Sequence, residues 1–172
     1  MTDTTTGSLE IFRQTDTVRE TFIRIEASGQ VTAYNGHVDL GTGIEVALAQ
    51  IVAEELNVPL DRVRVVLGNA SETMQITAIP LRKAAAQAHR QLLRLGALRL
   101  NGPEEDVTSA DGAVHWQAER CDYGALIAGQ EITLPLDLET PVKDPAHYQI
   151  VGISAPRRDM MEKLTGQQLY VH

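Results

Sequence analysis

The residues whose types and spacing could do chemistry gather around a glycine-punctuated loop. Leu40-Gly41-Thr42-Gly43 comes immediately before a segment of helical periodicity. The first turn of a helix carries backbone N–H groups that lack intrahelical partners, together with a partial positive charge. Two glycines would let a phosphate approach that backbone closely, and Thr42 adds a hydroxyl donor. Two interpretations stand: an anion-binding loop, or a tight turn in which Thr42 is the N-cap of the helix.

Two further sets of residues could bind an anion. Ser71 and Thr73 are hydroxyl residues at alternate positions just beyond a predicted strand. Both could donate to a phosphate, although hydroxyls in a turn also bond to the local backbone. Arg157 and Arg158 are adjacent and could clamp an anion, or could lie on a solvated surface.

Catalytic chemistry has less support. His37 and Asp39 lie two residues apart, as a metal site or an acid–base pair could use, but the other histidines are scattered and form no ligand spacing. Cys121 lies between Arg120, which favours a thiolate, and Asp122, which opposes it. An independent enzyme based on His37 and Asp39 would lack a second catalytic group. We therefore predict no catalytic residue and no metal ligand in this chain.

Composition limits the classes of function. The 172 residues are 43% apolar and 22% charged, as in ordinary globular domains. Asp and Glu outnumber Lys and Arg by 23 to 15, a net charge of −8 that disfavours nucleic acid as a partner. A single cysteine excludes an internal disulfide and a multi-cysteine metal site. The sequence has no membrane-spanning apolar run and no export signal, so we expect a cytoplasmic protein.

The elements that must position these residues follow from periodicity. Residues 1–20 lack a clear period and predict a flexible N-terminal arm. Apolar and polar residues alternate on both sides of a turn over 22–35, which predicts a β-hairpin. Helical spacing follows over 44–56, closed by Asn57, and a β-branched strand covers 62–67.

The second half of the chain is less regular. A long helix is predicted over about 81–100, where Gly96 could introduce a break, and a turn and strand over 111–117. We predict an α+β layered fold: a β-hairpin, a helix, a strand and a long helix packed on a small mixed sheet, with an irregular C-terminal third. The expected division is one αβ domain over 21–135 and an extended linker over 136–172.

Two long stretches resemble a known family. Residues 29–43, GQVTAYNGHVDLGTG, and 47–65, ALAQIVAEELNVPLDRVRV, are similar to the molybdenum-binding large subunits of the xanthine dehydrogenase/aldehyde oxidase family. The branch is that of the isoquinoline 1-oxidoreductase and nicotinate dehydrogenase large subunits. Residues 151–159 and 163–166 resemble the family's link into its hammerhead domain. The resemblance implies that the chain is an N-terminal portion of such a large subunit.

That resemblance implies a cofactor and partners. The cofactor is molybdenum on a pyranopterin dithiolene, in its cytosine dinucleotide form, held only together with the domains missing here. Gly41, Thr42 and Gly43 match the family's glycine loop before a helix, where Thr42 replaces a common glutamine. Ser71 and Thr73 match a motif that binds cofactor phosphate. The implied partners are other subunits of a molybdenum hydroxylase, including an iron–sulfur subunit, with self-association as a further possibility.

The sequence also departs from the family pattern. Relatives carry a Pro-Asn-Gln-Gly-type loop before the phosphate motif, whereas here Gly68-Asn69 leads directly into residues 70–73. The glycine-rich motif with the family's catalytic glutamate does not occur in these residues. The resemblance thus implies a partial cofactor-binding subunit of a hydroxylase for N-heterocycles or aldehydes, inactive alone. The alternative is a non-catalytic remnant or assembly module without cofactor.

Overall fold

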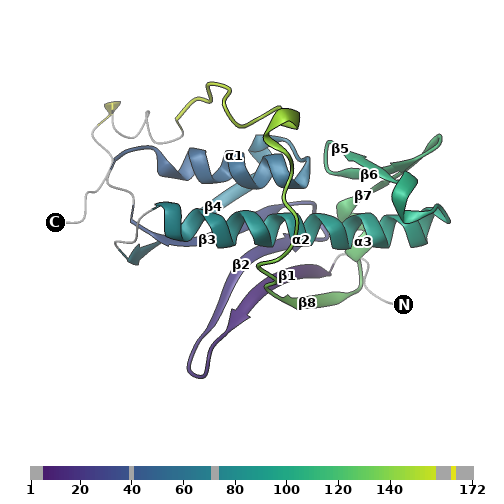
Figure 1. The fold of residues 1–172 in the computed structure, drawn as a ribbon, viewed down its shortest axis with the longest axis horizontal. Coiled ribbons are helices and arrows are strands. Elements are labelled where there is room, and N and C mark those ends of the chain that lie inside the picture. Colours follow the sequence, from purple (N-terminus) through teal and green to yellow (C-terminus); the bar gives the residue numbers. More distant parts are fainter. Residues whose placement is uncertain (1–5, 39–40, 71–73, 158–163, 166–172) are drawn as a thin grey trace.

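The computed structural model describes residues 6–38, 41–70, 74–157 and 164–165 (Figure 1). In chain order the elements are β1 (Ser8–Gln14), β2 (Arg19–Glu26), β3 (Val31–His37), α1 (Ile44–Leu56), β4 (Val63–Ala70), α2 (Met74–Leu100), β5 (Thr108–Ala110), β6 (Ala113–Trp116), β7 (Glu119–Asp122), α3 (Tyr123–Ile127) and β8 (Glu131–Pro135). Short 3-10 turns cover Leu60–Arg62, Glu104–Asp106 and Pro145–His147.

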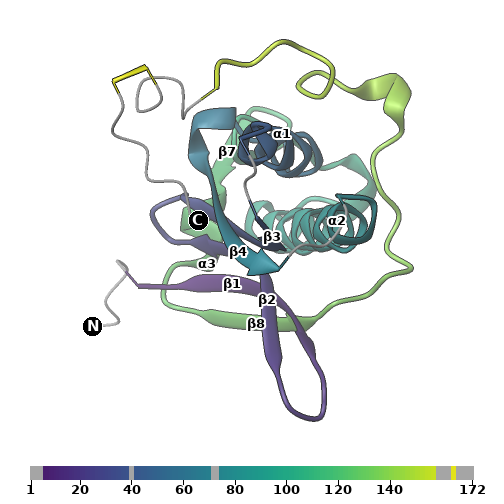
Figure 2. The same cartoon turned by 90° about the vertical axis from the view of Figure 1, so that its left-hand side faces the viewer.

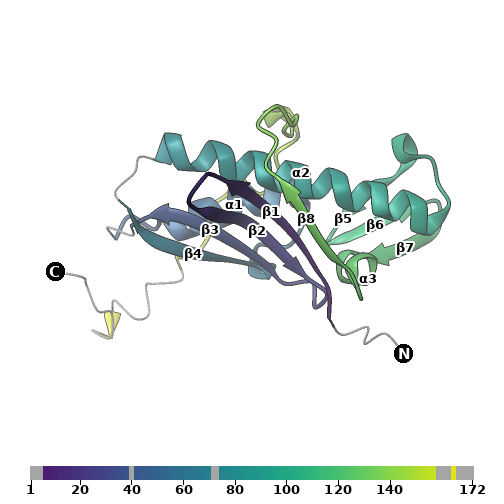
Figure 3. The same cartoon turned by 90° about the horizontal axis from the view of Figure 1, so that it is seen from below.

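Two sheets organise the chain. The larger is mixed and five-stranded, with the order β4-β3-β2-β1-β8, and the smaller contains β5-β6-β7 (Figure 3). In the larger sheet β3 pairs parallel with β4 and β1 pairs parallel with β8, while β1–β2 and β2–β3 are antiparallel. The parallel β3–β4 pair requires a crossover connection, and α1 supplies it. The predicted α+β layered fold with a mixed sheet is confirmed.

The two long helices cover one face of the large sheet (Figure 2). α1 contacts β4, and α2 contacts β1, β2 and β3. The core between the layers is aliphatic, and small residues on α2 let the helices approach closely. Its fully buried members include Leu9, Ile11, Ile23, Ile25, Val31, Ala33, Leu48, Val52, Leu56, Leu81, Ala84, Ala85, Ala88 and Leu92.

The predicted β-hairpin over 22–35 is confirmed as β2 and β3, but the flexible arm over 1–20 is wrong for the residues of β1. Ser8–Gln14 forms a strand between β2 and β8. Leu9 and Ile11 are completely buried there. The alternation in this segment is too short to identify a strand, and its pairing with β8 joins segments more than a hundred residues apart.

The long helix begins earlier than its periodicity predicts. α2 starts at Met74, so the expected start near 81 is wrong, and Pro80 lies inside the helix. A proline removes one helical hydrogen bond, which favours a helix start at that point. Here Ala78 packs against the core, and this burial supports the additional turns. At the other end no break occurs at Gly96, where an added Cβ would lie 2.3 Å from Val114 Cγ1. That glycine lets β6 pack directly on the helix.

Residues 136–157, here called the strap, lie across the outer side of the helical layer (Figure 2). The strap leaves β8, passes α2 and continues over α1. Apart from the 3-10 turn at Pro145–His147 it contains no regular element. Among the described residues, none of the helices combines the length and the apolar character needed to cross a membrane.

The position of β1 gives a test of the fold. Ile11→Ala should lower the free energy of unfolding by about 2–5 kcal/mol, because it leaves a cavity in the aliphatic core. Val18→Ala, in the exposed hairpin turn, should change it by less than about 0.5 kcal/mol. Chemical denaturation of both variants measures the difference. Equal small effects would contradict a buried β1.

Candidate cofactor-binding site

The candidate site begins where two parallel strands end. The β3–β4 register runs from Val31 opposite Val63 to His37 opposite Ala70. Because the pair is parallel, both strands end at the same edge of the sheet. In α/β folds ligands bind in the crevice at this carboxyl edge. The fold thus brings together the ends of the two strands that the predicted binding segments follow in the sequence.

Two glycines shape the first segment. Gly41 and Gly43 have φ values of 85° and 77°, in the left-handed region that glycine adopts without strain. Gly43 is the N-cap of α1, and its carbonyl accepts from the Val46 N–H at 3.2 Å. The interpretation of Thr42 as N-cap is therefore wrong. Thr42 is exposed, and residues 41–43 are called the glycine loop below.

Arg157, at the end of the strap, lies against the glycine loop. Its Nη2 donates a 2.8 Å hydrogen bond to the Gly41 carbonyl oxygen. A Cβ added to Gly43 would lie 3.2 Å from Arg157 Nε, which shows how closely the guanidinium follows the loop. The guanidinium brings a positive charge to the start of α1, a helix whose first turn carries Glu45.

Of the remaining sequence candidates, the structure describes only His37 near this edge. His37 is the last residue of β3, whereas Ser71, Thr73, Asp39 and Arg158 lie outside the described residues. Among the described residues, no group of three or more His, Cys, Asp and Glu side chains is arranged to hold a metal ion.

Cys121 lies on β7 in the small sheet, away from the glycine loop. Burial raises the pKa of the Cys121 thiol, with Arg99 lowering it and Asp122 raising it in smaller measure. The thiol is therefore protonated at neutral pH, which answers the question that its neighbours in sequence leave open.

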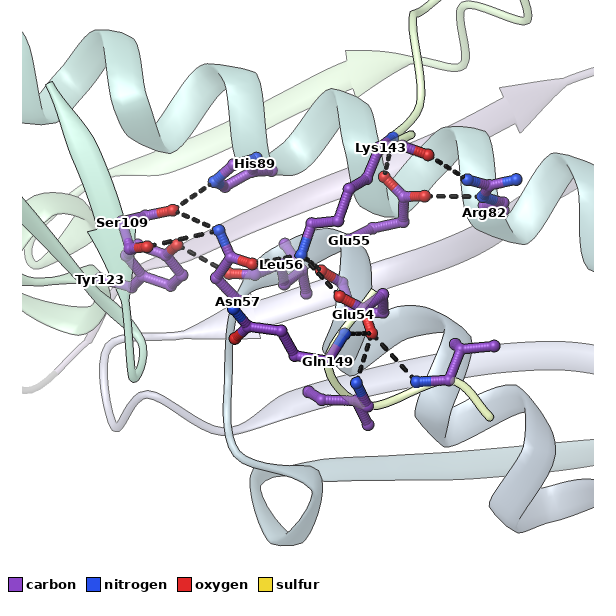
Figure 4. Close-up of polar contacts among 12 residues, drawn as sticks. Glu54, Glu55, Leu56, Asn57, Arg82, His89, Ser109, Tyr123, Lys143 and Gln149 are labelled. Atoms are coloured by element: carbon purple, nitrogen blue, oxygen red, sulfur yellow. Dashed lines mark hydrogen bonds and ion pairs between the residues drawn. The ribbon is translucent and has the colours of Figure 1, made fainter. Parts of the chain in front are cut away.

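A buried polar network between α1, α2 and the strap is the main feature that the sequence did not predict (Figure 4). Glu54 is almost completely buried, with 1% of the residue exposed. Its Oε2 accepts the backbone N–H groups of Gln149, Ile150 and Val151 at 2.9, 2.6 and 3.0 Å, and its Oε1 accepts from Lys143 Nζ at 2.8 Å. Burial alone would raise the pKa of Glu54, but these donors outweigh it and lower the pKa to about 2.

The adjacent carboxylate, Glu55, holds the strap at a second point. Its Oε1 accepts from Arg82 Nε at 2.6 Å, and its Oε2 accepts the Lys143 backbone N–H at 2.9 Å. Arg82 Nη2 in turn donates to the Lys143 carbonyl oxygen at 2.6 Å. Lys83 Nζ donates to the Thr140 carbonyl at 2.7 Å. Both long helices therefore bind the strap backbone directly.

The network continues from the end of α1 to the small sheet. The Asn57 side chain accepts from Lys143 Nζ and donates through Nδ2 to Ser109 Oγ at 2.8 Å. Ser109 Oγ lies 2.6 Å from His89 Nε2. The Tyr123 hydroxyl donates to the Leu56 carbonyl at 2.7 Å. The Ser109 hydroxyl therefore has hydrogen-bond partners in both Asn57 and His89. The Ser109–His89 pair fits a structural role rather than that of a nucleophile and its base.

The sequence contained one signal for this network. Glu54 and Glu55 are adjacent acids near the end of an otherwise largely apolar helix, α1, and both are buried. Two adjacent acids there indicate buried partners. The partners themselves lie 27 to 97 residues away in sequence, and local patterns contain no information about them.

The buried histidine predicts a pH dependence of stability. Burial, with the charge of Lys143 as a smaller cause, lowers the pKa of His89 from 6.5 to about 4. Between these values the unfolded chain binds a proton that the folded chain does not, so stability falls as the pH falls from 6.5 to 4. The expected loss is about 3 kcal/mol. Denaturation across this window should show a clearly smaller loss for His89→Gln, and an equal loss in both proteins would contradict it.

The comparisons with known proteins agree with this architecture. The family model for the molybdopterin cofactor-binding domain matches residues 3–159. The chain is 45% identical to one of the subunits of nicotinate dehydrogenase of Pseudomonas putida over 92% of its own length and 15% of that protein. It is 29% identical to the beta subunit of isoquinoline 1-oxidoreductase of Brevundimonas diminuta, over 87% of this chain and 26% of that protein. It therefore spans no more than about a quarter of these relatives.

A solved structure gives the same assignment. Quinoline 2-oxidoreductase from Pseudomonas putida 86 superposes with a TM-score of 0.52 and 25% identity, over 60% of this chain and 15% of that one. The match to the family model covers nearly the whole chain, including every helix and strand described above. The chain belongs to the molybdopterin cofactor-binding domain family, in the branch of the nicotinate dehydrogenase and isoquinoline 1-oxidoreductase subunits.

Proposed function

We propose that this chain forms one wall of the binding site for a molybdenum–pterin cofactor, in its cytosine dinucleotide form. Its binding groups are Gly41, Thr42, Gly43, Ser71 and Thr73, and it contributes no catalytic residue. The observation that carries the proposal is the glycine loop at the carboxyl edge of β3 and β4, directly before α1. When bound, the cofactor supplies the oxidation–reduction chemistry.

The chemistry of the loop fits a phosphate-bearing group. Left-handed glycines leave the backbone open to close approach, and the start of α1 favours an anion. Thr42 is exposed and adds a hydroxyl. The Arg157 guanidinium offsets the overall negative charge of the chain at this point. The arrangement can hold an anionic cofactor but offers no described pair of groups for general acid–base catalysis.

The proposed activity belongs to a larger assembly. The chain spans 15% and 26% of its two curated relatives, and on this proposal further domains complete the cofactor site. In the proposed assembly, other subunits supply that remainder and the iron–sulfur clusters that carry electrons away. The reaction would be hydroxylation of an N-heterocycle or an aldehyde with oxygen from water, and the proposed compartment is the cytoplasm.

One observation favours a second candidate, a non-catalytic assembly module. The fold completes its own core, and the strap already supplies the glycine loop with a partner in Arg157. Neither feature depends on a cofactor. On this alternative, the loop conformation is structural and the chain serves only to pack against other subunits.

Purification from the native host separates the two candidates. The complex containing this chain is isolated, and molybdenum and pterin are assayed per chain. Recovery with a larger subunit and stoichiometric molybdenum supports the cofactor wall. Recovery with a partner but without either metal or pterin, under conditions where a known molybdenum hydroxylase from the same cells is loaded, supports the assembly module.

Glycine-loop variants test the binding groups. Gly41→Asp and Gly43→Asp should each reduce molybdenum and pterin per chain at least about tenfold, because a carboxylate there repels a phosphate and both positions have φ values that a side chain adopts only with strain. The matched control is Gly129→Asp, another left-handed glycine with open space around it, which should retain the cofactor. Full retention in the two loop variants, with normal folding by circular dichroism, would exclude the loop as a cofactor contact.

A further inference from the structure

We propose that Arg157 is a positioning residue for the glycine loop, and that α1 fixes the location of Arg157 by binding the strap from the middle and the last turn of the helix. The coupling within the chain stands on observed contacts alone. Its consequence for cofactor binding rests on the function proposed above. Three of the observed contacts carry this coupling: one near the end of α1, one in its middle and one in the glycine loop before its start.

The first attachment lies in the last turn of α1. Glu54 accepts three successive backbone N–H groups, those of residues 149–151, and the ammonium of Lys143. Three amides converging on one carboxylate oxygen fix both the path and the direction of the strap. Because this carboxylate is buried, its donors cannot leave without exposing an unpaired charge to the protein interior.

The second attachment is one helical turn earlier. Gln50 Nε2 donates to the carbonyl oxygens of Ile150 and Ile153, at 2.9 and 2.8 Å. Residues four apart lie on the same face of a helix, so Gln50 and Glu54 form a row along α1. Glu54 binds strap residues 149–151, and Gln50, which is nearer the start of the helix, binds residues 150 and 153, which are on average later in the sequence. The strap therefore runs antiparallel to α1.

The third attachment is the glycine loop itself. Arg157 lies four residues beyond Ile153. Its guanidinium donates to the Gly41 carbonyl and occupies the space next to the Gly43 α-carbon that a side chain would need. A segment with two glycines has many accessible backbone conformations, and a fixed donor from outside the segment selects among them. Gln50 and Glu54 bind the strap backbone at residues 149–153, and on this proposal they thereby position Arg157 four residues further on, at a loop that precedes both residues in the sequence.

Amide hydrogen exchange on the purified protein measures this coupling without any cofactor. Arg157→Ala should accelerate exchange in residues 41–46 at least about tenfold, because it removes a charge-assisted hydrogen bond from the loop. Arg157→Lys should restore part of the protection. The matched control is Arg13→Ala, in an exposed ion pair of the distant β1–β2 hairpin, and it should leave exchange in 41–46 unchanged. Unchanged exchange in Arg157→Ala would overturn the proposal.

A variant in the middle of α1 tests whether the strap carries the effect. Gln50→Ala removes the second attachment while leaving the buried Glu54 in place, so the protein should fold. Exchange should accelerate both in residues 150–157 and in 41–46. Acceleration confined to 150–157 would show that Arg157 is held independently, and would overturn the role assigned to α1.

Cofactor content then separates the coupling from the proposed function. In the complex from the native host, Arg157→Ala should reduce molybdenum and pterin per chain several-fold, with partial recovery in Arg157→Lys. If exchange in residues 41–46 changes and cofactor content does not, the positioning role stands for the loop and the cofactor role of the loop fails. If cofactor falls without a change in exchange, the positioning proposal fails.

Discussion

A carboxylate buried between two helices and an irregular segment is the constraint on which the outer half of this molecule depends. An isolated carboxylate in the protein interior is costly unless it is fully hydrogen-bonded. Glu54 meets this condition with three backbone amides and one ammonium, and a pKa near 2 keeps it charged at any physiological pH. The cost of separating these groups holds residues 136–157 against the helices, although the only regular element of this segment is the short 3-10 turn at Pro145–His147.

The polar network around Glu54 extends from the strap to the small sheet, and Lys143 and Asn57 make the connections. Lys143 uses its ammonium on Glu54 and Asn57 and its backbone on Glu55 and Arg82, so a single residue joins α1, α2 and the strap. Asn57 ends α1 in the left-handed conformation, which directs its side chain toward Ser109 in the small sheet. The polar groups thus bind together four segments whose apolar surfaces would not by themselves select one relative arrangement.

Local patterns predict what local physics determines. The β2–β3 hairpin, α1 with Asn57 at its end, and the turn at Asp111-Gly112 all follow from periodicity and turn chemistry, and the structure contains them. The strand β1 does not follow from them, because its identity as a strand depends on β8, more than a hundred residues later. Spacing identifies the glycine loop but not its Arg157 partner, since 116 residues separate the hydrogen-bonded pair. Residue types locate the loop, whereas only tertiary structure reveals how it is held.

The polar network and the glycine loop lie in different parts of the molecule, and this difference affects where another domain can bind. Its polar network faces the outer side of the helical layer and is satisfied internally, so binding another domain there would gain few new hydrogen bonds. The carboxyl edge of β3 and β4 differs, because two chain segments leave it together and a helix begins beside it. An anionic group bound at that edge would meet a glycine loop that Arg157 of the strap already contacts. The entropy of ordering the loop is then lost on folding and not on binding, which favours a tight site at the edge of the sheet.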